Sequence, residues 1–370
     1  MTARIGISVD LERDGISGIG VCADRLLARL PVSADAITVF YGKGNRFTAP
    51  PRAGLRETAI RPWPGVPSTL RKAAYFMASC VACDLVHETT NIGWILPTRS
   101  RFRKVLEVHD VIAATCPEYA QRGATRAYRA LQARAVSAAD ALIVSSRHTA
   151  DMVRRNYPDV PAAKMTVVYR GHDAELFNPA PASDDAAKAA SGEPGYLLFV
   201  GMLSPRKNLA RCLAALAAAR RDGCAARLVI AGKAGWGSEE LVAELLAGKH
   251  PGATYLGGVA TERLPALYRG ARALLWPSLY EGFGIPIIEA MACGTPVITA
   301  NRTGTAEAAG DAGLLVDPES VPAIADAIRR IHNEPQLARQ LRDAGLKWSA
   351  AFTWQRYAEE IYGVYQRLLG

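Results

Sequence analysis

Short apolar segments alternate with longer segments of helical spacing along almost the whole chain, and this alternation restricts the fold more than any other feature. It is typical of βαβ units, whose strands run parallel in one sheet. In the first half we expect strands at residues 4–9, 36–40, 84–88, 104–109 and 141–146. In the second half we expect them at residues 196–201, 227–232, 253–258, 273–278 and 296–300. The sequence therefore predicts two open α/β sheets.

Residues 177–195, FNPAPASDDAAKAASGEPG, separate the two halves and show no periodicity. A chain of 370 residues with 49% apolar side chains can bury more than one core, because a single core stops growing at about 250–300 residues. We place the domain boundary near residue 180 and expect residues 336–370 to be helical only.

The formal net charge of +9 indicates an anionic partner, which could be a nucleic acid, a membrane surface or a phosphorylated small molecule. Seven cysteines are scattered through apolar surroundings, so we expect reduced core residues in a reducing compartment. Cys80 and Cys83 lack a second ligand pair at zinc spacing, and we predict no metal site there. The absence of a long apolar run or an apolar N-terminal leader favours a cytoplasmic protein.

Ligands of open parallel sheets bind beyond the carboxyl ends of the strands, so the residues after each strand are the candidates for chemistry. The glycines of residues 15–20, GISGIG, follow the first strand and would let amides at a helix start face an anion. His109 and Asp110 end one strand, and His87 and Glu88 end another. A strand-end histidine is also a common structural residue, so both interpretations stay open.

Arg206 and Lys207 follow the strand that ends near Gly201 and precede a helix that begins at Asn208. Two adjacent cations beside the amides of a helix start are suited to a diphosphate group. A solvated helix start would show the same residues, and this alternative also stays open.

Glu281 and Glu289 lie on either side of a glycine turn at residues 282–284, before and within a helix expected at residues 286–293. Eight residues span about 12 Å even when helical, whereas a retaining glycosidase needs two carboxylates about 5 Å apart. The spacing favours two ends of one extended ligand, with turn and helix amides between them for a negative group. A nucleotide diphosphate sugar has this form.

Eight segments together carry a resemblance that covers nearly the whole chain: SGIG, VHD, SSRHTA, VGMLSPRKNL, AGKAGW, LGGV, PSLYEGFGIPIIEAMACGTPVI and FTW. In them the sequence resembles glycosyltransferase family 4, whose members are retaining enzymes of the GT-B fold. The resemblance implies an α/β protein with two Rossmann-like domains whose parallel sheets face a central cleft. Residues 1–180 would bind the acceptor, residues 181–350 would bind the donor, and residues 351–370 would form a helix that packs toward the N-terminal domain.

The resemblance also implies roles for single residues. Arg206 and Lys207 would bind the diphosphate, Glu281 the sugar hydroxyls and Glu289 the ribose hydroxyls. His109 would lie under the sugar near the reacting carbon, so the implied catalytic set is His109, Glu281, Arg206 and Lys207. The implied donor-binding set is Gly18, Gly20, Gly201, Arg206, Lys207, Gly257, Glu281, Gly282, Phe283, Gly284, Ile285 and Glu289.

Some positions depart from the family pattern. Val21 and Cys22 stand where many relatives have an acidic or aromatic residue, and Arg302 and Gly304 are unusual in the loop of residues 301–313, where Glu307 keeps the usual acidic place. No D-x-D motif occurs at a strand end. We therefore expect no metal or other cofactor, with Arg206, Lys207 and helix amides stabilising the leaving diphosphate. The resemblance implies front-face transfer with retention of configuration.

The favoured function is transfer of a hexose, preferably mannose from GDP-mannose, to a glycan or polyprenyl-diphosphate-linked acceptor in cell-surface polysaccharide biosynthesis. UDP-hexoses stay open as donors, because the shape of the pocket and not a motif sets the substrate. The alternatives are a nucleotide-sugar epimerase and a non-catalytic nucleotide-sugar binding protein. Nucleic-acid binding is disfavoured, since no aromatic stacking platform accompanies the basic residues. Aromatic and basic residues at 61–80 and 99–104 predict reversible, peripheral association with an anionic inner membrane.

Overall fold

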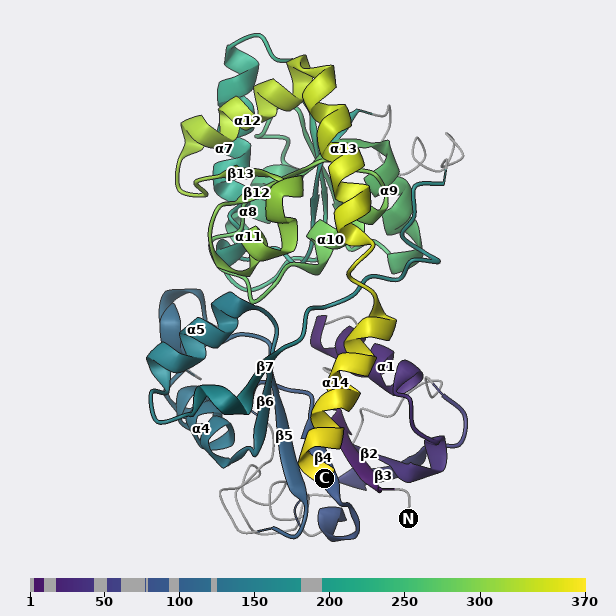
Figure 1. The fold of residues 1–370 in the computed structure, drawn as a ribbon. Coiled ribbons are helices and arrows are strands. Elements are labelled where there is room, and N and C mark those ends of the chain that lie inside the picture. Colours follow the sequence, from purple (N-terminus) through teal and green to yellow (C-terminus); the bar gives the residue numbers. More distant parts are fainter. Residues whose placement is uncertain are drawn as a thin grey trace. The chain divides into compact units, whose positions relative to one another are not determined.

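The computed structural model of the chain describes residues 3–9, 18–42, 52–60, 77, 79–92, 100–120, 125–180 and 195–370. They form two compact units (Figure 1). Unit 1 comprises the chain up to Arg170 together with Trp354–Gly370, and unit 2 comprises Gly171–Thr353. The segment of residues 61–80 that predicts membrane association lies mostly outside the described residues.

The described part of unit 1 contains a parallel sheet in the order β3-β2-β1-β4-β5-β6-β7. Its strands are β1 (Ile5–Val9), β2 (Ile37–Gly42), β3 (Arg56–Ile60), β4 (Leu85–Glu88), β5 (Arg103–Val108), β6 (Ala141–Val144) and β7 (Met165–Val167). Its helices are α1 (Gly18–Arg29), α3 (Ile112–Thr115), α4 (Thr125–Ala138), α5 (Arg147–Asn156) and α14 (Trp354–Leu369). The inner strands β1, β4 and β6 are buried throughout, as expected for a sheet with helices on both faces.

Unit 2 contains a parallel sheet in the order β10-β9-β8-β11-β12-β13. Its strands are β8 (Tyr196–Val200), β9 (Leu228–Ala231), β10 (Ala253–Gly257), β11 (Ala271–Trp276), β12 (Val297–Ala300) and β13 (Leu314–Val316). Its helices are α7 (Leu209–Arg221), α8 (Glu239–Leu246), α9 (Leu264–Gly270), α10 (Ile285–Ala292), α11 (Thr303–Ala309), α12 (Val321–Asn333) and α13 (Pro335–Ser349). Both sheets therefore have the predicted α/β, Rossmann-like organisation.

Three strands were absent from the sequence-based prediction, namely β3, β7 and β13. Each lies at an edge of its sheet. An edge strand pairs on one side only and needs a weaker apolar pattern than a central strand, and β7 and β13 have only three residues each. Edge position and short length explain why the sequence pattern did not reveal them.

Helix α14 follows unit 2 in the sequence but packs in unit 1, where it contacts α1. Figure 1 shows α14 in yellow beside α1 in purple. Tyr357, Ile361 and Tyr365 recur every fourth residue and are buried, because this spacing puts them on one face of a helix. The chain thus completes the core of unit 1 with its last segment.

The first passage between the units, at Arg170–Gly171, lies before the boundary that the linker composition predicts near residue 180. Residues just after it pack in unit 2. Phe177 lies edge-on to the ring of Tyr268, and Arg269 Nε donates to the carbonyl of Asn178 at 2.8 Å. These contacts assign residues 171–180 to unit 2, although their composition is that of a linker.

Strand order reverses between β1 and β4 in unit 1 and between β8 and β11 in unit 2. At such a switch point the loops leave neighbouring strands in opposite directions, and the space beyond the carboxyl ends is left for a ligand. The residues that follow these strands therefore define where each unit offers a site.

Candidate functional site

In unit 2 the chain leaves β8 at Gly201, whose φ of 122° suits glycine. A short 3₁₀ turn, Pro205–Lys207, carries the two predicted cations. Asn208 ends this turn in the left-handed region, with φ 66°. Its side-chain amide donates to the carbonyls of Pro277 at 2.9 Å and Pro318 at 2.6 Å, which holds the turn against the neighbouring loops.

The structure brings Arg206, Lys207 and Glu281 together at this switch point. Lys207 Nζ lies 2.7 Å from Glu281 Oε1, and Arg206 Nη1 lies 2.5 Å from Glu281 Oε2. Arg206 Nη1 also donates to the carbonyl of Tyr280 at 2.9 Å. Arg206 and Lys207 each carry one positive charge, and Glu281 carries one negative charge. The cluster therefore has one positive charge in excess.

The electrostatics of the cluster are those of a buried site. Burial alone would raise the pKa of Glu281, but the charges of Arg206 and Lys207 outweigh it and hold that pKa below its usual value. Burial lowers the pKa of Lys207 to about 8, although Glu281 opposes the effect. Lys207 is therefore charged at neutral pH but gives up its proton more readily than an exposed lysine.

Trp276, the last residue of β11, contacts the cluster through Lys207. Lys207 Nζ lies 4.0 Å from the centroid of its indole ring, a cation–π contact. The indole N–H donates to the carbonyl of Val200 at 2.7 Å, which fixes the plane of the ring. Trp276 is an aromatic platform for Lys207 that the sequence analysis did not identify.

The predicted glycine turn follows Glu281 and leads into α10. Gly284 has φ 132°, and a Cβ atom there would lie 2.9 Å from Ile287 Cδ1 and 3.2 Å from the ring of Trp276. Helix α10 begins at Ile285, has Pro286 in its first turn and is followed by Gly294 with φ 76°. The helix predicted from the sequence is confirmed, and its N-terminal amides give a partial positive charge next to the cluster.

The two unusual residues of the 301–313 loop have structural explanations. The Gly304 N–H donates to the carbonyl of Glu281 at 3.0 Å, and a Cβ atom at this position would lie 2.3 Å from the carbonyl oxygen of Gly282. Arg302 pairs with Asp317 and Glu319. Gly304 therefore permits close approach of two loops, and Arg302 is held by acidic neighbours.

Glu289 lies on α10 and is partly buried. The hydroxyl of Tyr268 donates to its Oε2 at 3.0 Å. Burial raises the pKa of Glu289 to about 7, and the hydrogen bond from Tyr268 opposes this effect only in part. One oxygen of the Glu289 carboxylate is thus hydrogen-bonded to Tyr268, and this carboxyl group titrates near neutral pH.

The remaining predicted donor-site glycines occupy loop and helix-start positions. Gly18 begins α1, and a Cβ atom there would meet no described atom within 4 Å, so packing does not require a glycine. Gly20 is buried in the same helix. Gly257 ends β10 with φ 68°, and its carbonyl accepts from the Gly232 N–H at 2.7 Å.

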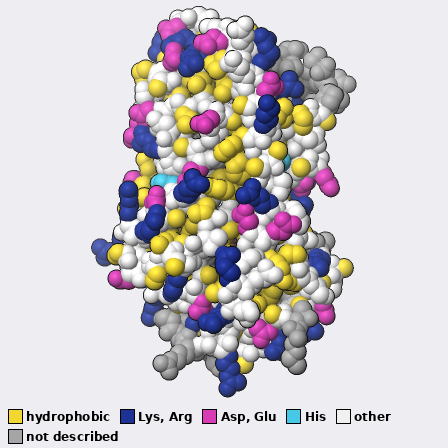
Figure 2. Space-filling view, in the orientation of Figure 1, with side chains coloured by type: hydrophobic (Ala, Val, Ile, Leu, Met, Phe, Trp, Pro, Cys, Tyr) yellow, Lys and Arg dark blue, Asp and Glu magenta, His cyan; other side chains and the backbone are white. Residues whose placement is uncertain are grey.

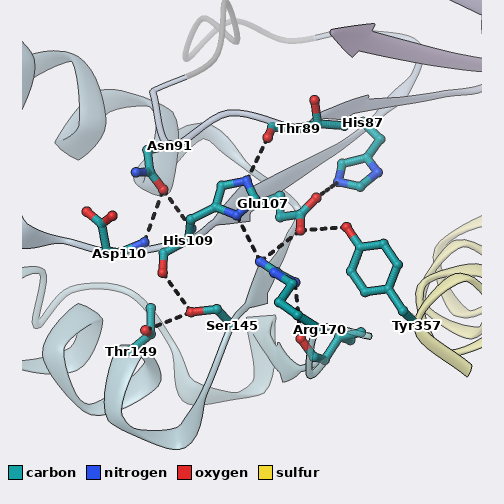
Figure 3. A network of polar contacts seen from close by, with 11 residues as sticks. His87, Thr89, Asn91, Glu107, His109, Asp110, Ser145, Thr149, Arg170 and Tyr357 are labelled. Carbon is teal, nitrogen blue, oxygen red and sulfur yellow. Dashed lines mark hydrogen bonds and ion pairs between the residues drawn. The ribbon is translucent and has the colours of Figure 1, made fainter. Parts of the chain in front are cut away.

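In unit 1, His109 follows β5 and each of its polar atoms has a protein partner (Figure 3). Its backbone N–H donates to Asn91 Oδ1 at 2.6 Å, and its carbonyl accepts from Ser145 Oγ at 2.7 Å. Its ring Nε2 lies 2.8 Å from the carbonyl of Thr89, and its Nδ1 lies 3.1 Å from Arg170 Nη2. His109 is therefore fixed at the end of the sheet where ligands of such folds bind.

Glu107, Arg170 and Tyr357 form a buried network behind His109 that the sequence analysis missed. Arg170 Nη2 lies 2.8 Å from Glu107 Oε1, and the Tyr357 hydroxyl donates to the same oxygen at 2.7 Å. A charged residue inside the apolar strand at 104–109 was the one signal for it, because a buried carboxylate needs a partner. The partners come from distant parts of the sequence.

Two further strand-end candidates of unit 1, His87 and Asp110, have contacts within the protein. His87 is fully buried in β4, and its Nδ1 lies 2.6 Å from the Tyr365 hydroxyl of α14. Burial lowers the pKa of His87 to about 4, so the ring is neutral at physiological pH. Asp110 Oδ1 accepts from the Ile112 N–H at 3.1 Å at the start of α3.

Cys22, Glu107 and His109 offer three ligand atoms within 4.8 Å of one another, the spacing of a possible metal site. The guanidinium of Arg170, however, contacts both Glu107 and His109. Burial also raises the pKa of the Cys22 thiol to about 12, so the thiol stays protonated. This arrangement does not suit a cation. A carboxylate in place of Cys22 would lie close to that of Glu107.

Two family models match the chain, "Glycosyltransferase Family 4" over residues 16–176 and "Glycosyl transferases group 1" over residues 182–348. O-antigen chain mannosyltransferase B of Escherichia coli is 33% identical over 289 residues, which cover 77% of this chain and 75% of that protein. A D-inositol 3-phosphate glycosyltransferase of Corynebacterium urealyticum is 29% identical over 378 residues, which cover 92% of this chain and 88% of that protein.

Solved structures share the fold over the whole length. Sucrose-phosphate synthase from Thermosynechococcus elongatus has a TM-score of 0.78 at 24% identity and covers 99% of both chains. HepE from Anabaena, in complex with UDP-glucose, has a TM-score of 0.77 at 19% identity and covers 99% of this chain and 100% of its own. The chain is therefore a glycosyltransferase with the GT-B fold. Within that class it belongs to glycosyltransferase family 4.

Proposed function

We propose that the protein transfers a hexose, with mannose favoured, from a nucleotide diphosphate sugar to a glycan or polyprenyl-diphosphate-linked acceptor, with retention of configuration. The observation that carries this proposal is the cluster of Arg206, Lys207 and Glu281 beside the N-terminus of α10. Its excess positive charge and helix amides are suited to a diphosphate. The similarity to an O-antigen mannosyltransferase supports mannose, and GDP-mannose is the favoured donor.

The donor would lie along unit 2 with its ends at the two glutamates. When Arg206 and Lys207 bind the diphosphate, their ion pairs with Glu281 would weaken. The carboxylate of Glu281 would then accept hydrogen bonds from hydroxyls of the sugar. Glu289 would accept ribose hydroxyls through the oxygen that Tyr268 leaves available. The base would lie near Gly257, and the amides of residues 283–285 would complete the anion site.

The reaction would proceed at one face of the sugar. The oxygen of the acceptor hydroxyl bonds to the anomeric carbon, while the bond from that carbon to the phosphate oxygen breaks. The leaving phosphate oxygen takes the hydroxyl proton, so the products are the glycoside and a nucleoside diphosphate. Arg206, Lys207 and the α10 amides stabilise the charge that develops on the diphosphate, a role that requires no metal ion.

A donor screen tests this proposal. Thermal unfolding is measured with GDP-mannose and with other GDP-, UDP-, ADP- and dTDP-sugars, and a donor at 100 times its dissociation constant adds about 2.7 kcal/mol of stability. The stabilisation should be lost in Lys207→Gln and kept in Arg329→Gln, a matched control that removes a surface arginine paired with Asp222 and Asp326. Stabilisation that survives in Lys207→Gln would contradict the assignment of the donor site.

Product analysis separates the proposed reaction from its alternatives. NMR of the product should show the anomeric configuration of the donor and a strict requirement for acceptor. Conversion of the donor sugar without acceptor would indicate an epimerase. Donor binding without any conversion, across glycan and lipid-linked acceptors, would indicate a binding protein.

We further propose peripheral contact with an anionic membrane through the basic residues at 61–80 and 99–104. None of the helices in the described part of the chain is long and apolar enough to span a membrane. Within these segments Arg101, Arg103 and Lys104 are the described basic residues; Arg101 and Arg103 are exposed, whereas Lys104 is buried. On the face in Figure 2, Lys and Arg side chains are scattered among Asp and Glu and form no separate block.

Liposome flotation tests membrane contact. The wild type should float with anionic vesicles at low salt but not at high salt, because each basic residue near the surface contributes about 1 kcal/mol within a Debye length. A variant with Arg71, Lys72, Arg101 and Arg103 changed to Gln should remain unbound. Equal flotation of that variant would contradict the assigned surface.

A further inference from the structure

Glu107 is a fully buried carboxylate in β5 with two strong partners on one oxygen. Arg170 Nη2 and the Tyr357 hydroxyl lie 2.8 Å and 2.7 Å from Oε1. Arg170 is 2% exposed, and its Nη1 donates to the carbonyl of Val168 at 3.1 Å. The charges of Glu107 and Arg170 cancel, so a charged pair is held in the interior of unit 1 without net charge.

The same arginine reaches His109 and determines the protonation of its ring. A guanidinium can only donate hydrogen bonds, so His109 Nδ1, 3.1 Å from Arg170 Nη2, must be the acceptor. A backbone carbonyl can only accept, so Nε2, 2.8 Å from the carbonyl of Thr89, must carry the proton. The contacts of His109 therefore require a neutral ring with its proton on Nε2.

Thr89 connects this ring to the switch point of the sheet. Its hydroxyl donates to the carbonyl of Ser8 in β1 at 2.8 Å, and Thr89 itself follows β4. The ring of His109 is thus oriented by residues at the carboxyl ends of three strands, and Figure 3 shows Arg170 between Glu107 and the ring.

We propose that Glu107 and Arg170 are a positioning pair for glycosyl transfer, which fixes the ring of His109 and keeps it uncharged beside the reacting sugar. This inference rests on the proposed function and on the place under the reacting sugar that the family resemblance implies for His109. The transition state of glycosyl transfer has oxocarbenium-like positive charge on the sugar ring. A neutral imidazole tolerates this charge, whereas an imidazolium would oppose it.

Burial and the charge of Arg170 together keep the ring neutral against the pull of Glu107. Burial, the largest cause, and the charge of Arg170 lower the pKa of His109, while Glu107, the hydrogen bond with the carbonyl of Thr89 and, more weakly, Asp110 raise it. The other groups around this carboxylate are neutral at physiological pH: the thiol of Cys22, the ring of His87, whose Nε2 lies 3.7 Å from Glu107 Oε2, and the hydroxyls of Tyr357 and Tyr365. Without Arg170, the charge of Glu107 would act on the His109 ring uncompensated and would raise its pKa.

The test is the variant Arg170→Gln in the full chain, studied by NMR with ¹⁵N-labelled histidine and by steady-state kinetics with GDP-mannose. Wild-type His109 should show the Nε2–H form and should not titrate between pH 5.5 and 8. In Arg170→Gln the ring should titrate within this range, and kcat should fall by about fourfold at pH 6, where about three-quarters of ordinary histidines are charged. Donor affinity, measured by thermal shift, should change little because the proposed diphosphate and ribose contacts, Arg206, Lys207 and Glu289, lie in unit 2.

Two further variants separate positioning from structural support. Tyr357→Phe removes the other hydrogen bond to Glu107 and should leave the titration of His109 and the pH profile of kcat unchanged, even where it lowers stability. Arg170→Lys keeps the positive charge and should restore most of kcat at pH 6. A purely structural role would instead predict that the loss of kcat follows the loss of stability in all three variants.

Several results would overturn the inference. A wild-type His109 ring that titrates near its ordinary pKa, or that carries its proton on Nδ1, contradicts it directly and requires no variant. An Arg170→Gln enzyme with the wild-type kcat and pH profile also contradicts it. If Arg170→Gln does not fold, the wild-type spectrum decides, together with the charge-balanced variant Glu107→Gln/Arg170→Met, in which kcat should fall at unchanged donor affinity. If the wild type transfers no sugar, the proposed function fails, while the ring spectra still test the pair.

Discussion

Donor affinity should fall about fivefold between pH 8 and pH 9, because Lys207 loses its charge there. Burial lowers the pKa of this lysine from 10.5 to about 8, so at pH 9 only about one molecule in ten retains the ammonium. The sign follows from the direction of the shift. The charged form predominates below pH 8, and rising pH removes a positive charge that the diphosphate requires.

The size of the effect follows from the charge pair that donor binding creates. A unit charge about 4 Å from an ammonium contributes about 4 kcal/mol at an effective dielectric constant of 20. This energy corresponds to about three pKa units, so the bound donor should raise the pKa of Lys207 to about its ordinary value. Binding should therefore take up about half a proton at pH 8 and about 0.9 proton at pH 9, and the affinity should fall about fivefold over this interval.

Isothermal titration calorimetry with GDP-mannose between pH 7 and 9 provides the assay, in two buffers of different ionisation enthalpy that reveal proton uptake. A nucleotide sugar is a suitable probe because its diphosphate is a diester, which stays fully ionised over this range. Lys207→Gln should bind weakly and without this pH dependence. A wild-type affinity that is constant from pH 7.5 to 9, with no proton uptake, would refute the reasoning for Lys207.

Three further outcomes are expected. Glu281→Ala should lose most transfer, by about 100-fold or more in kcat, with an unchanged circular dichroism spectrum; wild-type turnover would exclude its role. Glu289→Gln should weaken donor binding more than turnover, because the proposed ribose contact would be made both before and during transfer, and this is checked by comparing donor affinity with kcat. Transfer should continue in excess EDTA, and a complete loss that added metal reverses would show that a metal ion is required.

The central strands and the glycine turn could be predicted from the sequence because short-range patterns determine them. Strand β8 is an unbroken apolar run, β1 contains Ser8 among apolar residues, and both strands are buried throughout. Helix α10 has its proline and its terminal glycine at the expected ends. The edge strands escaped prediction because pairing on one side requires less apolar sequence.

Contacts between distant residues explain what the sequence could not give for the candidate sites. Glu107 is recognisable as a charged residue in an apolar strand, but Arg170 and Tyr357 lie 63 and 250 positions further along the chain, and no local pattern connects them. Trp276 likewise reads as an ordinary apolar strand residue until the structure puts Lys207 over its ring. The sequence therefore predicts which residues follow the strands better than it predicts which distant residues contact and orient them.

The balance of charge assigns different chemical tasks to the two units. In unit 1 the pair of Glu107 and Arg170 is neutral, and its contacts with His109 require an uncharged ring. In unit 2 the cluster of Arg206, Lys207 and Glu281 has one positive charge in excess beside the start of α10. The positive cluster in unit 2 would stabilise a dianionic diphosphate, whereas the neutral pair in unit 1 would not. An acceptor hydroxyl and a sugar ring are neutral, so the neutral pair and uncharged ring in unit 1 are suited to them. The excess positive charge in unit 2 is the physical basis for the proposal that unit 2 binds the donor diphosphate.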